Sequence, residues 1–155
     1  RPWAATSFFL AEAALCRGRG EEVEAVALRS RARILLVHPG FPVPTPWAFQ
    51  AYARVPEEWK RGTEGEWRWT WEDKEGERHA RFRNDLEPVV MEKYRWIREA
   101  KDWLSAREEI ADAGMSGSGA TVFGILHRGA DERKLLEGTR RELGEGAWII
   151  VADTL

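Results

Sequence analysis

Three short apolar runs constrain the fold of this chain more than any other feature. They are Arg33–His38 (RILLVH), Thr121–Leu126 (TVFGIL) and Ala147–Ala152 (AWIIVA). Each run is too short for a stable helix, and each has the length and the content of β-branched residues that are typical of a buried strand. A sheet built from such strands has to be covered by other elements, so the segments between the runs decide the architecture.

Those intervening segments carry helical patterns. Asp131–Leu143 is amphipathic, and Asn84 with Glu87 three residues later has the spacing of a capping box at a helix start. The apolar residues that follow have approximately helical spacing. These apolar residues are Val89, Val90, Tyr94, Ile97 and Leu104. A second short helical stretch is expected to run to about Ile110. The order of elements predicts an α/β fold, more narrowly an α+β two-layer sandwich with helices packed on one face of a sheet.

Two further segments have clear local patterns. Pro42, Pro44 and Pro46 predict a rigid extended loop, with Pro46 at the first position of a helix that reaches about Arg54. The tryptophans at 67, 69 and 71 alternate with polar residues and predict one strand of a β-hairpin that ends near Arg83. Such a hairpin can pack its tryptophan face on the body of the protein, or it can serve as a stacking platform for bases. The lack of net basic charge favours packing.

Composition excludes several classes of protein. The 155 residues include 24 Lys and Arg against 26 Asp and Glu, so the net charge of −2 gives no bulk attraction to nucleic acid or to an anionic membrane. No apolar run approaches the roughly 20 residues needed to cross a bilayer. Cys16 is the single cysteine, which rules out an internal disulfide and favours a reducing, cytoplasmic location. Since the chain has only three histidines in addition to Cys16, a Cys/His zinc site is not expected, and no metal ligand is assigned.

Because the chain starts with Arg1, we expect it to be processed or to be a piece of a longer protein.

The segment Gly114–Thr121 (GMSGSGAT) is the strongest local signal. Its glycines and serines suit a close approach to a phosphate or to another backbone, although a tight turn is the commoner use of such a loop. It lacks the Gly-Lys-Ser/Thr ending of a Walker loop and the G-x-S-x-G spacing of a nucleophile elbow. A dinucleotide fingerprint runs strand, loop, helix, whereas here a helix is expected before the loop and a strand after it.

Extended to Gly124, the same segment resembles the third signature motif of the GHMP small-molecule kinases. Four more segments follow that family's order, and together they cover nearly the whole chain. They are Phe8–Leu10, Arg17–Glu21 (RGRGE), His38–Phe49 with its T-P-x-x-F stretch, and Asn84–Glu87 (NDLE). The resemblance is closest to the members of the family that act on a cytidine diphosphate substrate in non-mevalonate isoprenoid biosynthesis.

This resemblance implies a fold and a site. The sheet would be mainly antiparallel, and Thr45, Pro46 and Phe49 would bind the cytidine end of a small-molecule cytidine diphosphate substrate. The glycine loop would shape the site of ATP, the co-substrate, which acts together with Mg²⁺. The loop residues concerned are Gly114, Met115, Ser116, Gly117, Ser118 and Gly119. The alternative for Phe49 is a core position in a short helix.

The chain also departs from the family pattern, and these differences bear on its activity. No segment of the chain resembles the family's glycine-serine phosphate loop, and Ala5 stands at the position of the catalytic aspartate. We therefore expect residues 1–30 to be a remnant of an N-terminal catalytic domain and residues 31–155 to be the C-terminal domain, with a variable insertion at about 55–83. The isolated chain would lack kinase activity without its N-terminal half. The alternative is a non-catalytic binding or dimerisation module on the same fold, because an uncovered cleft surface would favour a homodimer.

Overall fold

The computed structural model describes residues 13–18, 22–57, 60, 64–73, 75–144 and 146–154, which divide into two compact units. Among these described residues, those within 32–67 and 81–154 form the larger unit, and those within 13–31 and 68–80 form the smaller unit. Strands β5 (Glu64–Asp73) and β6 (Gly76–Arg83) contribute residues to both units. The described part contains no helix that is long and apolar enough to span a membrane.

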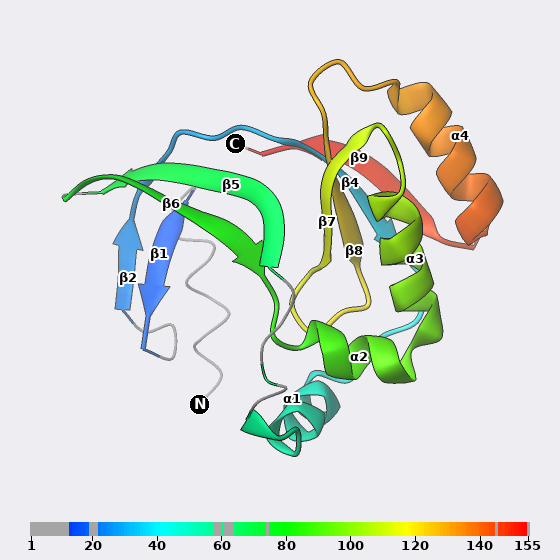
Figure 1. The fold of residues 1–155 in the computed structure, drawn as a ribbon, viewed down its shortest axis with the longest axis horizontal. Coiled ribbons are helices and arrows are strands. Elements are labelled where there is room, and N and C mark those ends of the chain that lie inside the picture. Colours follow the sequence, from blue (N-terminus) through cyan, green and yellow to red (C-terminus); the bar gives the residue numbers. More distant parts are fainter. Residues whose placement is uncertain are drawn as a thin grey trace. The chain divides into compact units, whose positions relative to one another are not determined.

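A four-stranded antiparallel sheet forms the centre of the larger unit (Figure 1). Its strands are β4 (Arg33–His38), β7 (Ile110–Met115), β8 (Val122–Leu126) and β9 (Trp148–Asp153), in the order β7-β8-β4-β9. The three apolar runs of the sequence are the three neighbouring strands β8, β4 and β9, which confirms their prediction as strands. The register pairs Val37 with Val122, so the end of β4 lies beside the beginning of β8.

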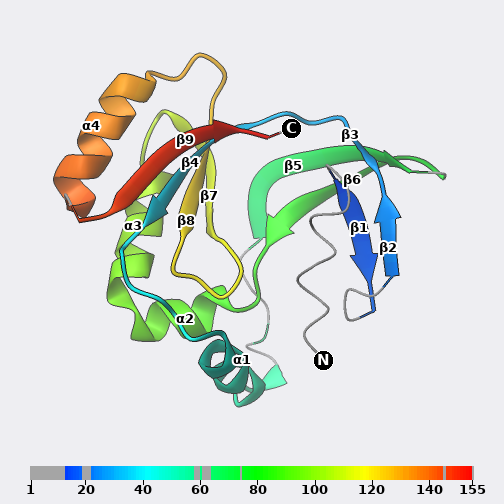
Figure 2. The same cartoon turned by 180° about the vertical axis from the view of Figure 1, so that it is seen from behind.

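Four helices share the hydrophobic core with this sheet. They are α1 (Thr45–Ala53), α2 (Glu87–Lys93), α3 (Arg95–Ser105) and α4 (Glu132–Leu143). Leu35 and Val37 of β4 are fully buried and share the core with Ile97 and Leu104 of α3 and Leu135 of α4. In both views α3 and α4 lie beside the sheet, whereas α2 and α1 lie at the end of its strands (Figures 1 and 2). The α+β fold with helices on one face of a mainly antiparallel sheet is therefore confirmed.

The smaller unit is built from hairpins. Strand β1 (Ala14–Arg17) pairs antiparallel with β2 (Glu22–Ala25). The short strand β3 (Ala27–Leu28) pairs with β5, and β5 lies beside β6, so the predicted tryptophan hairpin is confirmed. The three hairpin tryptophans are half-buried, whereas Arg68 between them is exposed. Phe8–Leu10, Ala5, Gly20 and Glu21 lie outside the described residues.

Two predicted helix boundaries are wrong. Helix α2 begins at Glu87 with Leu86 as its N-cap residue, not at Asn84, and no side chain caps it. The predicted capping box is absent because the side chains of Asn84 and Glu87 bond to a distant segment of the chain, described below. Residues near Ile110 are not helical either: α3 ends at Ser105, and Ile110 opens strand β7. Pairing with β8 decides the conformation of β7, whose sequence (IADAGM) carries little strand signal of its own.

Charged side chains tie α4 to the edge of the sheet. The predicted helix start is confirmed, because Asp131 is the N-cap residue and accepts a hydrogen bond from the amide of Lys134 at 3.0 Å. Arg33 on β4 donates through Nε and Nη2 to the two carboxylate oxygens of Glu132, and through Nη1 to Asp153 at 2.8 Å. This Arg33–Glu132–Asp153 group joins α4, β4 and β9 at one end of the sheet.

The Arg33–Glu132 pair predicts a pH dependence of stability. Hydrogen bonding from the Arg33 guanidinium lowers the pKa of the Glu132 carboxyl below its usual value. A lowered carboxyl pKa stabilises the folded state above the unfolded-state pKa, and that contribution is lost as pH falls through the folded-state pKa. In Glu132→Gln we therefore expect a smaller loss of the free energy of unfolding between about pH 5 and pH 3, measured by urea denaturation. Glu137→Gln is the control, because Glu137 is exposed and its pair with Arg133 is a surface pair. An equal acid response of wild type and Glu132→Gln would contradict this role.

Candidate functional site

The glycine segment forms the turn of the hairpin between β7 and β8. Gly114 and Met115 belong to β7, so the expectation that a helix leads into this loop is wrong. The amide of Ser116 donates to Thr121 O and the amide of Gly119 donates to Ser116 O, both at 2.9 Å. Of the two residues between Ser116 and Gly119, only Gly117 has a positive φ, of 56°, which is the pattern of a type II′ turn. The loop is thus a tight hairpin turn with a defined hydrogen-bond pattern.

This turn is packed at its base, Gly119, and open at its tip, Gly117 and Ser118. Gly119 has a φ of 85°, and a Cβ at this position would lie 3.0 Å from Met115 Sδ and 3.4 Å from Val43 Cγ2. At Gly117 a Cβ would meet nothing within 4 Å. In the part of the chain that the structure describes, the amides of Gly117 and Ser118 have no hydrogen-bond acceptor. Two successive unbonded amides at an open tip can donate to an anionic oxygen such as that of a phosphate. The peptide bond that follows Gly119 is cis.

Helix α1 carries the residues expected to bind the cytidine end of a substrate. The predicted helix is confirmed, with Pro46 in its first turn and Ala48 buried in the core. Thr45 and Phe49 are four residues apart and therefore share one face of the helix. Phe49 is 58% exposed, so it is not a core residue. An exposed aromatic ring on a helix anchored by a buried neighbour is free to contact a ligand.

One hydrogen bond brings the two predicted groups of site residues together. Thr45 Oγ1 lies 2.9 Å from Ser118 Oγ, although the two residues are 73 positions apart in the chain. The sheet register explains this proximity, because β4 ends beside the start of β8 and so the proline loop and the glycine loop leave the sheet at the same end. The Thr45–Phe49 face of α1 and the tip of the hairpin turn therefore form one candidate site.

Asn84 and Glu87 have the spacing of a helix cap, but the structure shows that both side chains bond to the glycine loop. Asn84 Nδ2 donates to the carbonyl oxygens of Met115 at 2.7 Å and of Gly117 at 2.8 Å, and its Oδ1 accepts from the amide of Leu86 at 3.0 Å. Glu87, 2% exposed, accepts from the amide of Met115 at 2.6 Å and pairs with Lys101. The resemblance of the N-D-L-E segment to a family motif marked these residues as important. Its spacing alone, however, predicted a helix cap and gave no sign of a contact with the glycine loop.

The far side of α1 is occupied by aromatic packing. Lys93 Nζ lies 4.1 Å from the centroid of the Trp47 ring, and the Trp47 and Tyr94 rings meet edge to face with centroids 5.4 Å apart. Trp47 lies on the side of the helix away from Phe49, at the wall of a groove of about 560 Å³ between α1 and α2. These contacts hold α1 against the junction of α2 and α3.

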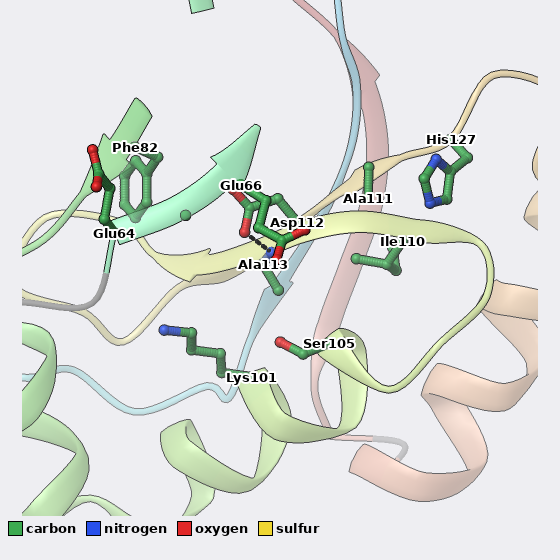
Figure 3. Close-up of a pocket in the computed structure, with 11 residues that line it drawn as sticks. Glu64, Glu66, Phe82, Lys101, Ser105, Ile110, Ala111, Asp112, Ala113 and His127 are labelled. Carbon is green, nitrogen blue, oxygen red and sulfur yellow. Dashed lines mark hydrogen bonds between the residues drawn. The ribbon is translucent and has the colours of Figure 1, made fainter. Parts of the chain in front are cut away.

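A separate pocket of about 490 Å³ lies on the α3 and β7 side of the larger unit (Figure 3). None of the predicted site residues lines it. Its central carboxylate, Asp112, already accepts from the amides of Trp67 and Ala113, both at 2.9 Å, and its Lys101 is paired with Glu87. The main polar groups of this pocket therefore serve the fold. Among the described residues, no group of three or more His, Cys, Asp or Glu side chains could hold a metal ion.

Comparisons with known proteins give consistent results. Residues 72–144 match the family model described as GHMP kinases C terminal. The chain is 34% identical over 152 residues to the 4-diphosphocytidyl-2-C-methyl-D-erythritol kinase of Methylacidiphilum infernorum, covering 96% of this chain and 49% of that protein. It is 33% identical over 145 residues to the enzyme of the same name from Geobacter metallireducens, covering 94% of this chain and 48% of that protein. The chain thus spans about half the length of these relatives.

A solved structure agrees with these relatives. The crystal structure of a 4-(cytidine 5′-diphospho)-2C-methyl-D-erythritol kinase superposes with a TM-score of 0.58 at 26% sequence identity. The superposition covers 89% of this chain and 48% of the other. The similarity therefore extends over most of this chain, in three dimensions as well as in sequence.

The two glycines of the hairpin turn predict different costs for the same substitution. Gly117→Ala places an alanine at a positive φ in open space, which costs about 1 kcal/mol in the free energy of unfolding. Gly119→Ala adds a close contact with Met115 Sδ to the same backbone strain, so we expect a cost of about 2 kcal/mol or more. Urea denaturation of both variants measures the difference. Equal costs would mean that the base of the turn is not packed as described.

Proposed function

The chain belongs to the GHMP kinase family, and from that premise we propose that it is the C-terminal part of an ATP-dependent kinase that phosphorylates 4-diphosphocytidyl-2-C-methyl-D-erythritol. The observation that carries the proposal is the hydrogen bond between Thr45 and Ser118. It joins the segment that resembles the family's substrate loop to the segment that resembles its third motif. Similarity to kinases along 94–96% of the chain favours this function over a non-catalytic binding or dimerisation module.

In this proposal α1 binds the cytidine end of the substrate. Phe49 supplies an exposed aromatic face, and stacking of a base on such a face contributes about 1–3 kcal/mol. Pro46 in the first turn and the buried Ala48 hold the helix in place before a ligand arrives, so little ordering is required on binding. Thr45, one turn before Phe49, connects this face to the hairpin turn.

The hairpin turn would then face phosphate groups. The amides of Gly117 and Ser118 and the nearby hydroxyls are hydrogen-bond donors, which suit phosphate oxygens. The turn residues 116–121 carry no carboxylate, which is the protein ligand that Mg²⁺ sites most often use. We infer that Mg²⁺ accompanies ATP and takes its protein ligands outside these residues.

The domain assignment is also part of the proposal. We infer that residues 31–155 form the C-terminal domain and that residues 1–30 belong with an N-terminal catalytic domain, with a variable insertion at about 55–83. The division of the chain into compact units, which falls between Arg31 and Ala32, supports the first boundary.

We expect the purified 155-residue chain to lack phosphotransfer activity. None of its segments resembles the phosphate loop of the family, and phosphoryl transfer depends on groups that position and neutralise the transferred phosphoryl. The measurement is ADP release from ATP and Mg²⁺ with 4-diphosphocytidyl-2-C-methyl-D-erythritol as acceptor. Turnover that depends on this acceptor would contradict the expectation and would place the catalytic groups within these residues.

The substrate site is tested by ligand binding, which needs no turnover. Phe49→Ala should weaken binding of cytidine 5′-diphosphate about tenfold, because one stacking face is lost. Isothermal titration calorimetry compares this variant with Gln50→Ala, an exposed neighbour on the same helix but on another face. Equal weakening in both variants, or none in Phe49→Ala, would remove Phe49 from the site.

A further inference from the structure

Asn84 makes a contact that few side chains could replace. Its amide nitrogen donates to two carbonyl oxygens of the hairpin, Met115 O and Gly117 O, while its amide oxygen accepts from the backbone amide of Leu86. Carbonyls only accept and backbone amides only donate, so these partners determine the orientation of the Asn84 amide. One neutral side chain thereby holds both the end of β7 and the tip of the turn.

Glu87 holds the same strand end from the buried side. Its carboxylate is almost completely buried, and it accepts from the amide of Met115 while Lys101 of α3 neutralises its charge. A buried carboxylate is tolerated only when it is paired and hydrogen-bonded. The Glu87 carboxylate therefore depends on both the Met115 amide and the Lys101 ammonium group. Asn84 bonds the Met115 carbonyl and Glu87 bonds the Met115 amide, so the backbone of Met115 is held on both sides.

Beyond Met115 this support reaches the tip of the turn and then α1. Asn84 bonds Gly117 O, the next residue is Ser118, and Ser118 bonds Thr45. The amides of Gly117 and Ser118, which face no acceptor in the described chain, therefore belong to a turn that is fastened at both its base and its tip.

We propose that Asn84 and Glu87 are positioning residues that hold the hairpin turn 116–119 in the conformation that presents its amides and Ser118 to the ligand on α1. This inference rests on the proposed function, because it assigns these residues to the same site. Neither residue touches the ligand; each acts through the backbone of the turn.

Asn84→Asp tests the inference with a minimal change. The introduced carboxylate still accepts from Leu86, but it cannot donate to Met115 O and Gly117 O and it repels both. By NMR, hydrogen exchange at the amides of Ser116 and Gly119 should accelerate about tenfold or more, the effect of losing hydrogen bonds of ordinary strength. Exchange at Leu135, whose amide donates to Asp131 O at the start of α4, should not change.

Two further variants make the result unambiguous. Arg133→Gln changes the net charge by the same amount on the exposed face of α4 and should leave exchange in the turn unchanged. If Asn84→Asp does not fold, Asn84→Ser, which is neutral and smaller, is measured in the same way. Faster exchange confined to the turn supports the inference. Equal acceleration at Leu135, or no acceleration in the turn, overturns it, because Asn84 would then be a general stabiliser or no support at all.

Binding of cytidine 5′-diphosphate separates this inference from the proposed function. We expect about fivefold weaker binding in Asn84→Asp, since the positioned turn contributes to the site. If the turn opens locally but the wild-type chain does not bind cytidine 5′-diphosphate, the support of the turn by Asn84 stands and the proposed function fails. If the wild type binds and the variant binds equally well, Asn84 does not position the turn for this ligand and the inference is overturned.

Discussion

Pairing of β4 with β8 is the constraint on which the geometry of this protein depends. The two strands are more than eighty residues apart in the chain, and their antiparallel register places the end of β4 beside the beginning of β8. The proline loop that follows β4 and the hairpin turn that precedes β8 therefore leave the sheet together. Without that register, Thr45 and Ser118 could not meet, and the two segments would remain unrelated motifs.

Buried polar groups provide the next level of organisation. Glu87 opens α2 and Asn84 lies three residues before it, yet both satisfy backbone groups at the end of β7 and in the turn after it. This arrangement leaves α2 without a side-chain cap and gives the hairpin turn its support. Exchanging a local hydrogen bond for a long-range one is favourable because the Met115 amide is buried and would otherwise require another partner. The stability of α2 and the shape of the turn are thus linked.

Much of the architecture could be predicted from the sequence. Arg33–His38, Thr121–Leu126 and Ala147–Ala152 were predictable as strands because apolar runs of that length suit a buried sheet, and the helix α4 was predictable from the amphipathic pattern of Asp131–Leu143. Strand β7 could not be predicted, since IADAGM becomes a strand only by pairing with β8. For the candidate site, the sequence showed the motifs and their order. It did not show that Asn84 and Glu87 contact the glycine turn, because these contacts join segments that are distant in the chain.

The sequence by itself determined most of the strands and helices, though not β7 or the start of α2, together with the stiffness of the proline loop and the family that the motifs indicate. These properties depend on the local chemistry of neighbouring residues: apolar periodicity, the restricted φ of proline and short-range hydrogen bonds. Only the tertiary structure decided that Phe49 is exposed, that Thr45 meets Ser118 and that Asn84 and Glu87 support the turn between β7 and β8. Those outcomes depend on sheet register and on the satisfaction of buried polar groups, which involve residues that are distant in the chain and leave no local pattern.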